Sequence, residues 1–242
     1  MIILFHTIAF SFISLYNTSK LQYKERAVML QVTPSIASAD PLAIRSELAR
    51  LQSLGRLHLD IEDGNFIDNI TFGKKTVCAI AQAFSGTLDV HLMTTQPESY
   101  LSWLAQAHIQ AVCGHLEALP YPKRFLLQAR KLGMKAGIAL NLKTLPEVLL
   151  SYTDCLDYVL VMTSEPDSQG QVFFPQACSR VAAVKKLLSP GTKLWCDGGI
   201  QPEHLQPLYS AGMDVAIMGR AVFSAQNPVA AIQMYERSVI SR

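Results

Sequence analysis

Short apolar runs alternate with longer amphipathic segments along most of this chain. Eight runs rich in Val, Ile and Leu predict β-strands, at Gln31–Ile36, Arg56–Ile61, Thr87–Leu92, Gln110–His115, Lys135–Leu140, Leu156–Met162, Lys193–Cys196 and Asp214–Met218. Between them, apolar residues recur three or four positions apart, as at Leu48, Leu51 and Leu54, which predicts helices. Gly55 and Gly212 fall where such helices should end before the next strand.

This alternation predicts an α/β protein built as a single (β/α)₈ barrel, a TIM barrel. A doubly wound open sheet is the alternative, but that fold usually has a glycine-rich phosphate turn after its first strand. Here the first strand continues into Pro34-Ser35-Ile36-Ala37-Ser38 instead. In a barrel the C-terminal ends of all strands meet at one face, where active sites lie. Residues at these ends are therefore expected to converge.

The first 28 residues differ from the rest of the chain. Ile2 to Tyr16 is an apolar run interrupted by His6 and by hydroxyl residues, and it is shorter than the roughly 20 residues that a membrane-spanning helix needs. No Lys or Arg precedes it and no clear cleavage site follows, as a signal peptide would require. We therefore expect residues 1–28 to be a start-site artefact or a loosely attached, disordered N-terminal extension, with a membrane tether as the lesser alternative. Residues 29–242 are expected to form the barrel domain.

The composition is that of a globular protein with a large core, since 50% of the residues are hydrophobic and 17% are charged. The net charge of +2, without any basic run, predicts neither a nucleic-acid nor a membrane partner. The five cysteines are scattered and have no C-x-x-C spacing, which predicts reduced thiols in a cytoplasmic protein. Cys196 precedes Asp197 directly, and strand alternation should turn the two side chains to opposite faces.

Polar side chains with metal-binding chemistry stand at three strand ends. His58 and Asp60 are two residues apart and share one strand face, on which alternation also places Glu62. His91 and Asp197 end two further strands, and two histidines with two carboxylates suit a divalent cation such as Zn²⁺. A cation beside two carboxylates suits removal of a proton next to a carbonyl. One acid on each side of a planar enediolate would invert the carbon without a redox cofactor.

Two glycine turns follow the last two predicted strands, Asp197-Gly198-Gly199-Ile200 and Met218-Gly219-Arg220-Ala221. In (β/α)₈ barrels these loops often bind phosphate through backbone N–H groups and a helix N-terminus. Arg220 adds a positive charge that can pair with phosphate oxygens. The same glycines would equally serve as tight turns without a ligand, so the pattern of glycines leaves both interpretations open.

From about Val32 to Ser224 the chain resembles the ribulose-phosphate 3-epimerase family, metal-dependent (β/α)₈ isomerases of the pentose phosphate pathway. The combination of motifs is highly specific and covers most of the barrel. The matching stretches are Pro34-Ser35-Ile36-Ala37-Ser38-Ala39-Asp40, His58-Leu59-Asp60 with Asp63-Gly64, Asn69-Ile70-Thr71-Phe72-Gly73, Asp89-Val90-His91-Leu92-Met93, Val161-Met162-Thr163 and Asp197-Gly198-Gly199-Ile200.

The resemblance implies a role for each of these positions. Four metal ligands are implied, of which the two aspartates would also be the acid/base groups: His58, Asp60, His91 and Asp197. Ser35 would contact the sugar, and Met93 and Met162 would form part of an apolar cap over the reacting carbons. Gly198, Gly199 and Gly219 would lie at the phosphate. The resemblance further implies a divalent cation, which could be Zn, Fe, Mn or Co, a sugar-phosphate substrate and assembly into a homo-oligomer.

Departures from the family pattern cluster at the substrate end. Glu62 stands where the family usually has Met, Arg220 where it has Ser, and Asp68 where Pro is common. The loop 164–171 carries Glu165 and Asp167 where the family has a glycine-rich lid. Two hypotheses follow. The protein is an epimerase that inverts C3 of ribulose 5-phosphate, xylulose 5-phosphate or a related hexulose phosphate, or it is a sugar-phosphate-binding protein that has lost turnover.

Overall fold

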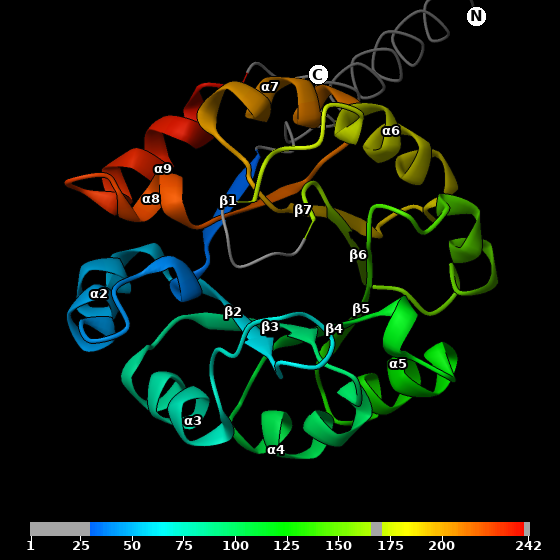
Figure 1. Cartoon of the computed structure of the whole chain (residues 1–242), viewed down its shortest axis with the longest axis horizontal. Helices are drawn as coiled ribbons and strands as arrows, with labels where there is room; N and C mark the ends of the chain where they lie inside the picture. Colours follow the sequence, from blue (N-terminus) through cyan, green and yellow to red (C-terminus); the bar gives the residue numbers. More distant parts are fainter. Residues whose placement is uncertain (1–29, 166–170, 240–242) are drawn as a thin grey trace, which may run out of the picture. The chain divides into compact units, whose positions relative to one another are not determined.

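The computed structural model describes residues 30–165 and 171–239. Eight parallel strands form one sheet whose neighbours follow the order β1-β8-β7-β6-β5-β4-β3-β2. The sheet curls into a barrel with the helices arranged around it (Figure 1). This arrangement confirms the predicted (β/α)₈ barrel and excludes the doubly wound alternative. The prediction for residues 1–28 falls outside the described part of the chain.

The elements alternate as the hydrophobic pattern predicts. The strands are β1 (Gln31–Pro34), β2 (Arg56–Glu62), β3 (Thr87–Met93), β4 (Ala111–His115), β5 (Lys135–Leu140), β6 (Tyr158–Met162), β7 (Lys193–Asp197) and β8 (Val215–Met218). The α-helices are α2 (Ile44–Leu51), α3 (Lys74–Ala83), α4 (Leu101–Gln106), α5 (Pro122–Lys131), α6 (Ala177–Leu187), α7 (Pro202–Ala211), α8 (Arg220–Phe223) and α9 (Pro228–Arg237). The 3₁₀ helices in the described ranges are η1 (Ile36–Ser38), η2 (Gln52–Leu54), η3 (Pro97–Tyr100), η4 (Leu116–Ala118) and η5 (Pro146–Ser151). Within residues 30–165 and 171–239, no helix is long and apolar enough to cross a bilayer.

Strand boundaries differ from the prediction by one or two residues. The first strand ends at Pro34 rather than Ile36, because the backbone turns there into η1. The sixth strand begins at Tyr158 rather than Leu156, after the 3₁₀ helix η5 that connects it to β5. Gly55 and Gly212 do follow helices, at φ 71° and 123°, where a residue with a side chain would be strained.

The core has two parts, one on each face of the curled sheet. The larger part packs the sheet against the helices, and Cys196 lies in it, as alternation predicts for a residue next to Asp197. The five cysteines are free. The smaller part lies on the opposite, inward faces of β4, β5 and β6 and includes Tyr158. Gly137 makes room for that ring, since a Cβ there would lie 2.6 Å from its Cζ atom.

The barrel has a seam between β1 and β2. β1 forms its ladder with β8 and β2 with β3; in the described residues the two strands meet through one isolated bridge, between Ser35 and His58. Side chains complete the junction. The Arg56 guanidinium donates to the carbonyl of Val32 at 2.9 Å, and Ser35 Oγ donates to a carboxylate oxygen of Asp60. Polar side chains thus replace much of the missing backbone ladder.

Candidate active site

The C-terminal ends of β2, β3 and β7 bring together the four residues predicted as metal ligands. One ligand atom from each of His58, Asp60, His91 and Asp197 lies within 4.8 Å of the others. Asp60 Oδ1 is 3.1 Å from His58 Nε2 and 3.2 Å from His91 Nδ1. His91 Nδ1 is also 3.4 Å from Asp197 Oδ2. The first three residues are buried and Asp197 is partly exposed, so the cluster opens to solvent on one side.

Strand register explains this convergence. The parallel pairing of β2 with β3 places Asp60 beside His91. Side chains two apart on a strand share a face, so His58 joins Asp60 on the inward face of β2. Asp197 is the last residue of β7 and therefore reaches the same end of the barrel.

Charge balance in the cluster fits a divalent cation. Burial lowers the pKa of His58, but the carboxylates of Asp60 and Asp89 outweigh it and raise that pKa well above its ordinary value. Burial opposes ionisation of Asp60 as well, yet His58 and His91 hold its pKa below the usual range. The buried carboxylates therefore favour the protonated form of both imidazoles, since burial of His91 is likewise outweighed by Asp197 and Asp60, which raise its pKa as well. A divalent cation with N and O ligands would take the place of those protons.

Two contacts behind the cluster involve residues to which sequence reasoning assigned no role. His58 Nδ1 bonds to a carboxylate oxygen of Asp89, and His91 Nε2 lies 2.9 Å from His115 Nε2. Burial raises the pKa of Asp89 and lowers the pKa of His115 to about 4. A signal for Asp89 was present, since it shares a strand face with His91 two residues later.

The residues predicted to contact the sugar surround the cluster. Ser35 is buried against Asp60. Glu62 is half-buried and accepts a hydrogen bond from Asn69 Nδ2 at 2.6 Å. Burial, followed by the negative charge of Asp60, raises the pKa of Glu62 to about 7. Met93 pairs in register with Glu62, and Met162, in register with Asp197, is likewise buried.

A small polar pocket forms between the turns that follow β7 and β8. It is lined by Ser35, Ser38, Gln171, Asp197, Gly199, Ile200, Gln201, Ile217, Gly219, Arg220 and Ala221. Gly198 and Gly199 have φ values of 112° and 64°, and a Cβ at Gly219 would clash with Ser38 Oγ. The turns are therefore shaped for glycine. Arg220 is exposed and donates to the carbonyl of Gln171 at 3.0 Å.

The lid segment is only partly described. Residues 166–170, and with them Asp167, lie outside the described ranges, whereas Ser164 is buried and Glu165 is exposed. Where the chain resumes, Gln171 lies against the glycine turn, since a Cβ at Gly199 would be 2.7 Å from its carbonyl oxygen. The end of this segment thus packs on the predicted phosphate pocket.

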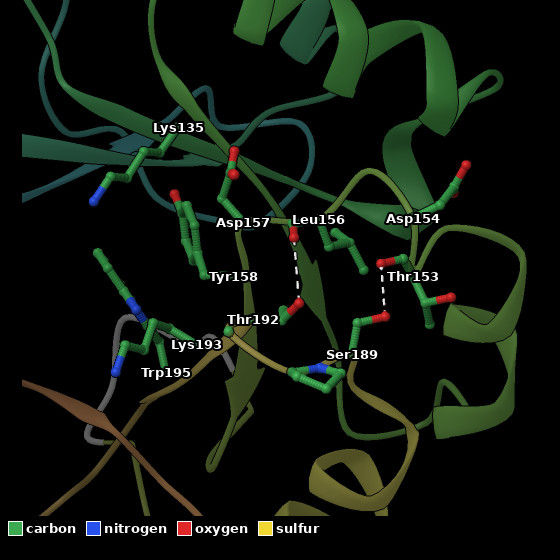
Figure 2. A pocket seen from close by; sticks show the side chains of 12 residues that line it. Lys135, Thr153, Asp154, Leu156, Asp157, Tyr158, Ser189, Thr192, Lys193 and Trp195 are labelled. Carbon is green, nitrogen blue, oxygen red and sulfur yellow. Dashed lines mark hydrogen bonds between the residues drawn. The ribbon is translucent and has the colours of Figure 1, made fainter. Parts of the chain in front are cut away.

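A second pocket, of about 600 Å³, opens at the N-terminal ends of β5, β6 and β7 (Figure 2). Tyr158 and Trp195 stack in its wall with ring centroids 4.3 Å apart, and Lys135 and Lys193 stand nearby (Figure 2). Parallel strands place their two ends on opposite faces of a barrel. This pocket therefore lies away from the cluster, and none of the predicted site residues lines it.

Asp63 joins two loops of the site, and its replacement gives a pH-dependent prediction. Its Oδ1 accepts from the N–H groups of Asn65 and Phe66 at 2.9 Å, and its Oδ2 accepts from the Thr95 N–H at 2.8 Å. Burial alone would raise the pKa of Asp63, but these donors lower it to about 2. Because that pKa is depressed, the carboxylate stabilises the fold above its unfolded pKa of about 4 and loses this contribution at lower pH.

We expect Asp63→Asn to lower the Tm by about 2–4 °C at pH 7, which corresponds to about 1 kcal/mol for a partly exposed, hydrogen-bonded carboxylate. The difference from wild type should narrow as the pH is lowered from 5 to 3. Thermal unfolding of wild type and Asp63→Asn at each pH gives the difference in Tm. Asp68→Asn, in the same loop, is the matched control. A difference that stays constant down to pH 3 would contradict the assignment.

The chain is similar in sequence to one family of known proteins. The profile of the Ribulose-phosphate 3 epimerase family matches residues 31–223. The chain is 34% identical over 218 residues to ribulose-phosphate 3-epimerase of Schizosaccharomyces pombe, covering 88% of this chain and 95% of that protein. It is 36% identical over 208 residues to the enzyme of that name from Synechocystis, covering 83% and 90%.

Solved structures with lower identity share the fold alone. Orotidine 5'-phosphate decarboxylase from Pyrococcus horikoshii superposes with a TM-score of 0.60 at 12% identity, covering 86% of this chain and 99% of that one. Tryptophan synthase from Mycobacterium tuberculosis superposes with a TM-score of 0.62 at 14% identity, covering 88% and 93%. The profile match and the identity to curated relatives go beyond fold, and they show that the chain belongs to the ribulose-phosphate 3-epimerase family.

Proposed function

We propose that this protein is a metal-dependent epimerase that inverts C3 of a ketose phosphate. The substrate would be ribulose 5-phosphate with xylulose 5-phosphate, or a related hexulose phosphate. The observation that carries the proposal is the cluster of His58, Asp60, His91 and Asp197, at the mouth of a barrel whose relatives are named ribulose-phosphate 3-epimerase. A cytoplasmic location and assembly into a homo-oligomer stay predictions from the sequence.

The proposed reaction uses the two aspartates of the cluster as acid and base. The four clustered residues would hold a divalent cation, which would polarise the substrate carbonyl and stabilise negative charge on its oxygens. Asp60 and Asp197 come from different strands; one would take the C3 proton from one face of the substrate and the other would return a proton to the opposite face. The hydroxyl of Ser35 donates to Asp60 and would hold that carboxylate in place.

The pocket after β7 and β8 would bind the phosphate group. Gly199 and Gly219 line this pocket and Gly198 adjoins Gly199, so the backbone N–H groups of these turns would bind the phosphate oxygens. α8 has only four residues, so its dipole would contribute little. The guanidinium of Arg220 would supply the positive charge, pairing with phosphate oxygens in place of its present contact with Gln171.

Glu62 would determine which sugar the site prefers. A half-buried carboxyl group beside the reacting carbons offers hydrogen bonds to hydroxyl groups, whereas Met would offer only apolar contact. We expect Glu62→Met to shift the ratio of kcat/KM by at least ~10-fold toward ribulose 5-phosphate over a hexulose phosphate. Glu62→Gln keeps the size and the hydrogen bonds, and it is the control that separates charge from shape. An unchanged ratio in Glu62→Met would refute the role.

A substrate panel in D₂O tests the proposed activity. Purified protein of measured metal content is incubated with ketopentose and ketohexose phosphates, and deuterium at C3 is followed by NMR. Incorporation together with inversion would support the epimerase. Binding of a sugar phosphate without any incorporation, in metal-loaded protein, would refute it and favour the binding-protein hypothesis, which the substitutions at Glu62, Glu165 and Arg220 motivate.

A further inference from the structure

A line of polar side chains, two buried and one partly exposed, runs from the cluster to the loops after β4 and β5. His91 Nε2 is 2.9 Å from His115 Nε2, and His115 Nδ1 is 3.4 Å from Glu117 Oε2. The two imidazole rings are fully buried, with centroids 4.9 Å apart. His115 Nδ1 has no hydrogen-bond partner in the described residues, so Glu117 is the charge that faces it.

These contacts set the positions of the ring protons. Two imidazole nitrogens 2.9 Å apart form a hydrogen bond only when one carries a proton and the other does not. A carboxylate accepts and never donates, so Glu117 favours the proton on His115 Nδ1. His115 then presents a lone pair at Nε2 and accepts the Nε2–H of His91. The nitrogen of His91 that faces Asp60 and Asp197 is then Nδ1, and a cation that displaces a proton there would bind its lone pair.

Glu117 is held so that one oxygen remains for His115. Its Oε1 accepts from the backbone N–H of Asn141 at 3.0 Å and from the hydroxyl of Thr144. Arg180 fixes that loop, because its guanidinium donates to the carbonyls of Asn141 and Thr144 at 2.7 and 2.5 Å. The Glu117 side chain is only 17% exposed. Its orientation toward His115 is therefore set by the surrounding loop.

We propose that His115 and Glu117 are positioning residues that fix the tautomer of His91 for metal binding. The arrangement parallels the other histidine of the cluster, where the carboxylate of Asp89 bonds to His58 Nδ1 and leaves Nε2 facing Asp60. One histidine is oriented by a carboxylate directly and the other through a second imidazole. Such partners typically change metal affinity about 10–100-fold. The inference rests on the proposed metal-dependent function.

Glu117→Gln tests the relay because it reverses the polarity at His115. Glutamine has one acceptor oxygen, which Asn141 N–H and the Thr144 hydroxyl would occupy, so its NH₂ group would face His115 Nδ1. A donor there moves the His115 proton to Nε2, where it opposes the Nε2–H of His91. His91 must then carry its proton on Nδ1, which competes with the cation. We expect the Zn²⁺ affinity to fall about 10–100-fold.

Two readouts separate this role from a merely structural one. Competition with a chromophoric chelator gives the Zn²⁺ affinity, and ¹⁵N NMR of the zinc-loaded wild type reports the ring tautomers. The expected tautomers are Nε2–H for His91 and Nδ1–H for His115. Thr144→Val is the matched control, since it loosens the same loop but keeps the carboxylate, and its Zn²⁺ affinity should stay within about 3-fold of wild type.

Three results would overturn the inference: wild-type Zn²⁺ affinity in folded Glu117→Gln, a proton on His115 Nε2 in zinc-loaded wild type, or an equal loss of affinity in Thr144→Val. The tautomer measurement needs no variant, so it decides the matter even if Glu117→Gln does not fold. Wild-type protein that binds Zn²⁺ without catalysing exchange would refute the proposed activity and leave the relay standing. Wild-type protein that binds no Zn²⁺ would refute both.

Discussion

Replacement of either Asp60 or Asp197 by Asn is expected to slow epimerisation by at least ~10²-fold. Asparagine keeps the shape of the side chain but cannot take up a proton at neutral pH. Asp60 is buried and bonded to Ser35, whereas Asp197 is more open to solvent, so the two carboxylates meet the substrate in different surroundings. Both are needed if one removes the proton and the other returns it.

Following exchange and inversion with each epimer in turn as the starting substrate shows which aspartate acts on which face. With one base removed, the other should still exchange the C3 proton of one epimer with D₂O while inversion is lost. The two variants should therefore retain exchange from opposite epimers. Metal content is determined for each, because both residues are also proposed ligands. Asp154→Asn, an exposed aspartate paired with Lys123, is the isosteric control. Inversion at wild-type rate in either variant would refute its assignment.

Gly137→Ala is expected to cost more stability than Asp63→Asn, about 2–3 kcal/mol and a Tm decrease of about 5–10 °C. The new Cβ would lie 2.6 Å from Cζ of Tyr158, inside a barrel interior that leaves this ring 2% exposed. Trp195 stacks on this ring with centroids 4.3 Å apart, so relief of the clash requires a shift of that stack, of the backbone or of the inward packing of β5 and β6. Thermal unfolding gives the size of the effect.

Two variants check the steric cause. Gly73→Ala is the control, because nothing lies within 4 Å of its Cβ position and its φ of −77° suits any residue; its effect should stay within about 1 kcal/mol. In a double-mutant cycle, Tyr158→Leu should recover part of the loss caused by Gly137→Ala, because the clashing ring atoms are removed. Strict additivity of the two losses would contradict the steric explanation.

The barrel fold and the central cluster could be predicted from the sequence for a clear physical reason. Strand alternation places His58 and Asp60 on one face, and the topology of a (β/α)₈ barrel then gathers all strand ends at one mouth. The exact end of β1 could not be predicted, because the turn into η1 depends on packing around Ile36, which is fully buried. The hydrogen bond from Asn69 to Glu62 likewise depends on the loop returning through the Asp63–Ile70 bridge.

His115 is the instructive case, because the sequence places it at the end of the fourth predicted strand, where it could line the mouth of the barrel, but shows no partner for it. Consecutive strands are neighbours in this fold, and His91 pairs in register with Cys113, so the residue two positions after Cys113 shares its inward face and comes next to the cluster. The sequence placed His115 at the end of a strand but gave no register between β3 and β4. Without that register the contact between the two imidazoles could not be inferred, and the role of Glu117 depends on it.

The seam between β1 and β2 couples the chemistry of the site to the mechanical closure of the barrel. Most neighbouring strands are held by a continuous backbone ladder, but here the bond from Ser35 to Asp60 is one of the few links across the gap. A cation or substrate that orders Asp60 would also tighten this junction, and its binding energy would oppose local opening of the cylinder. Binding at the active site would then also stabilise the fold, and loss of the ligand would weaken it.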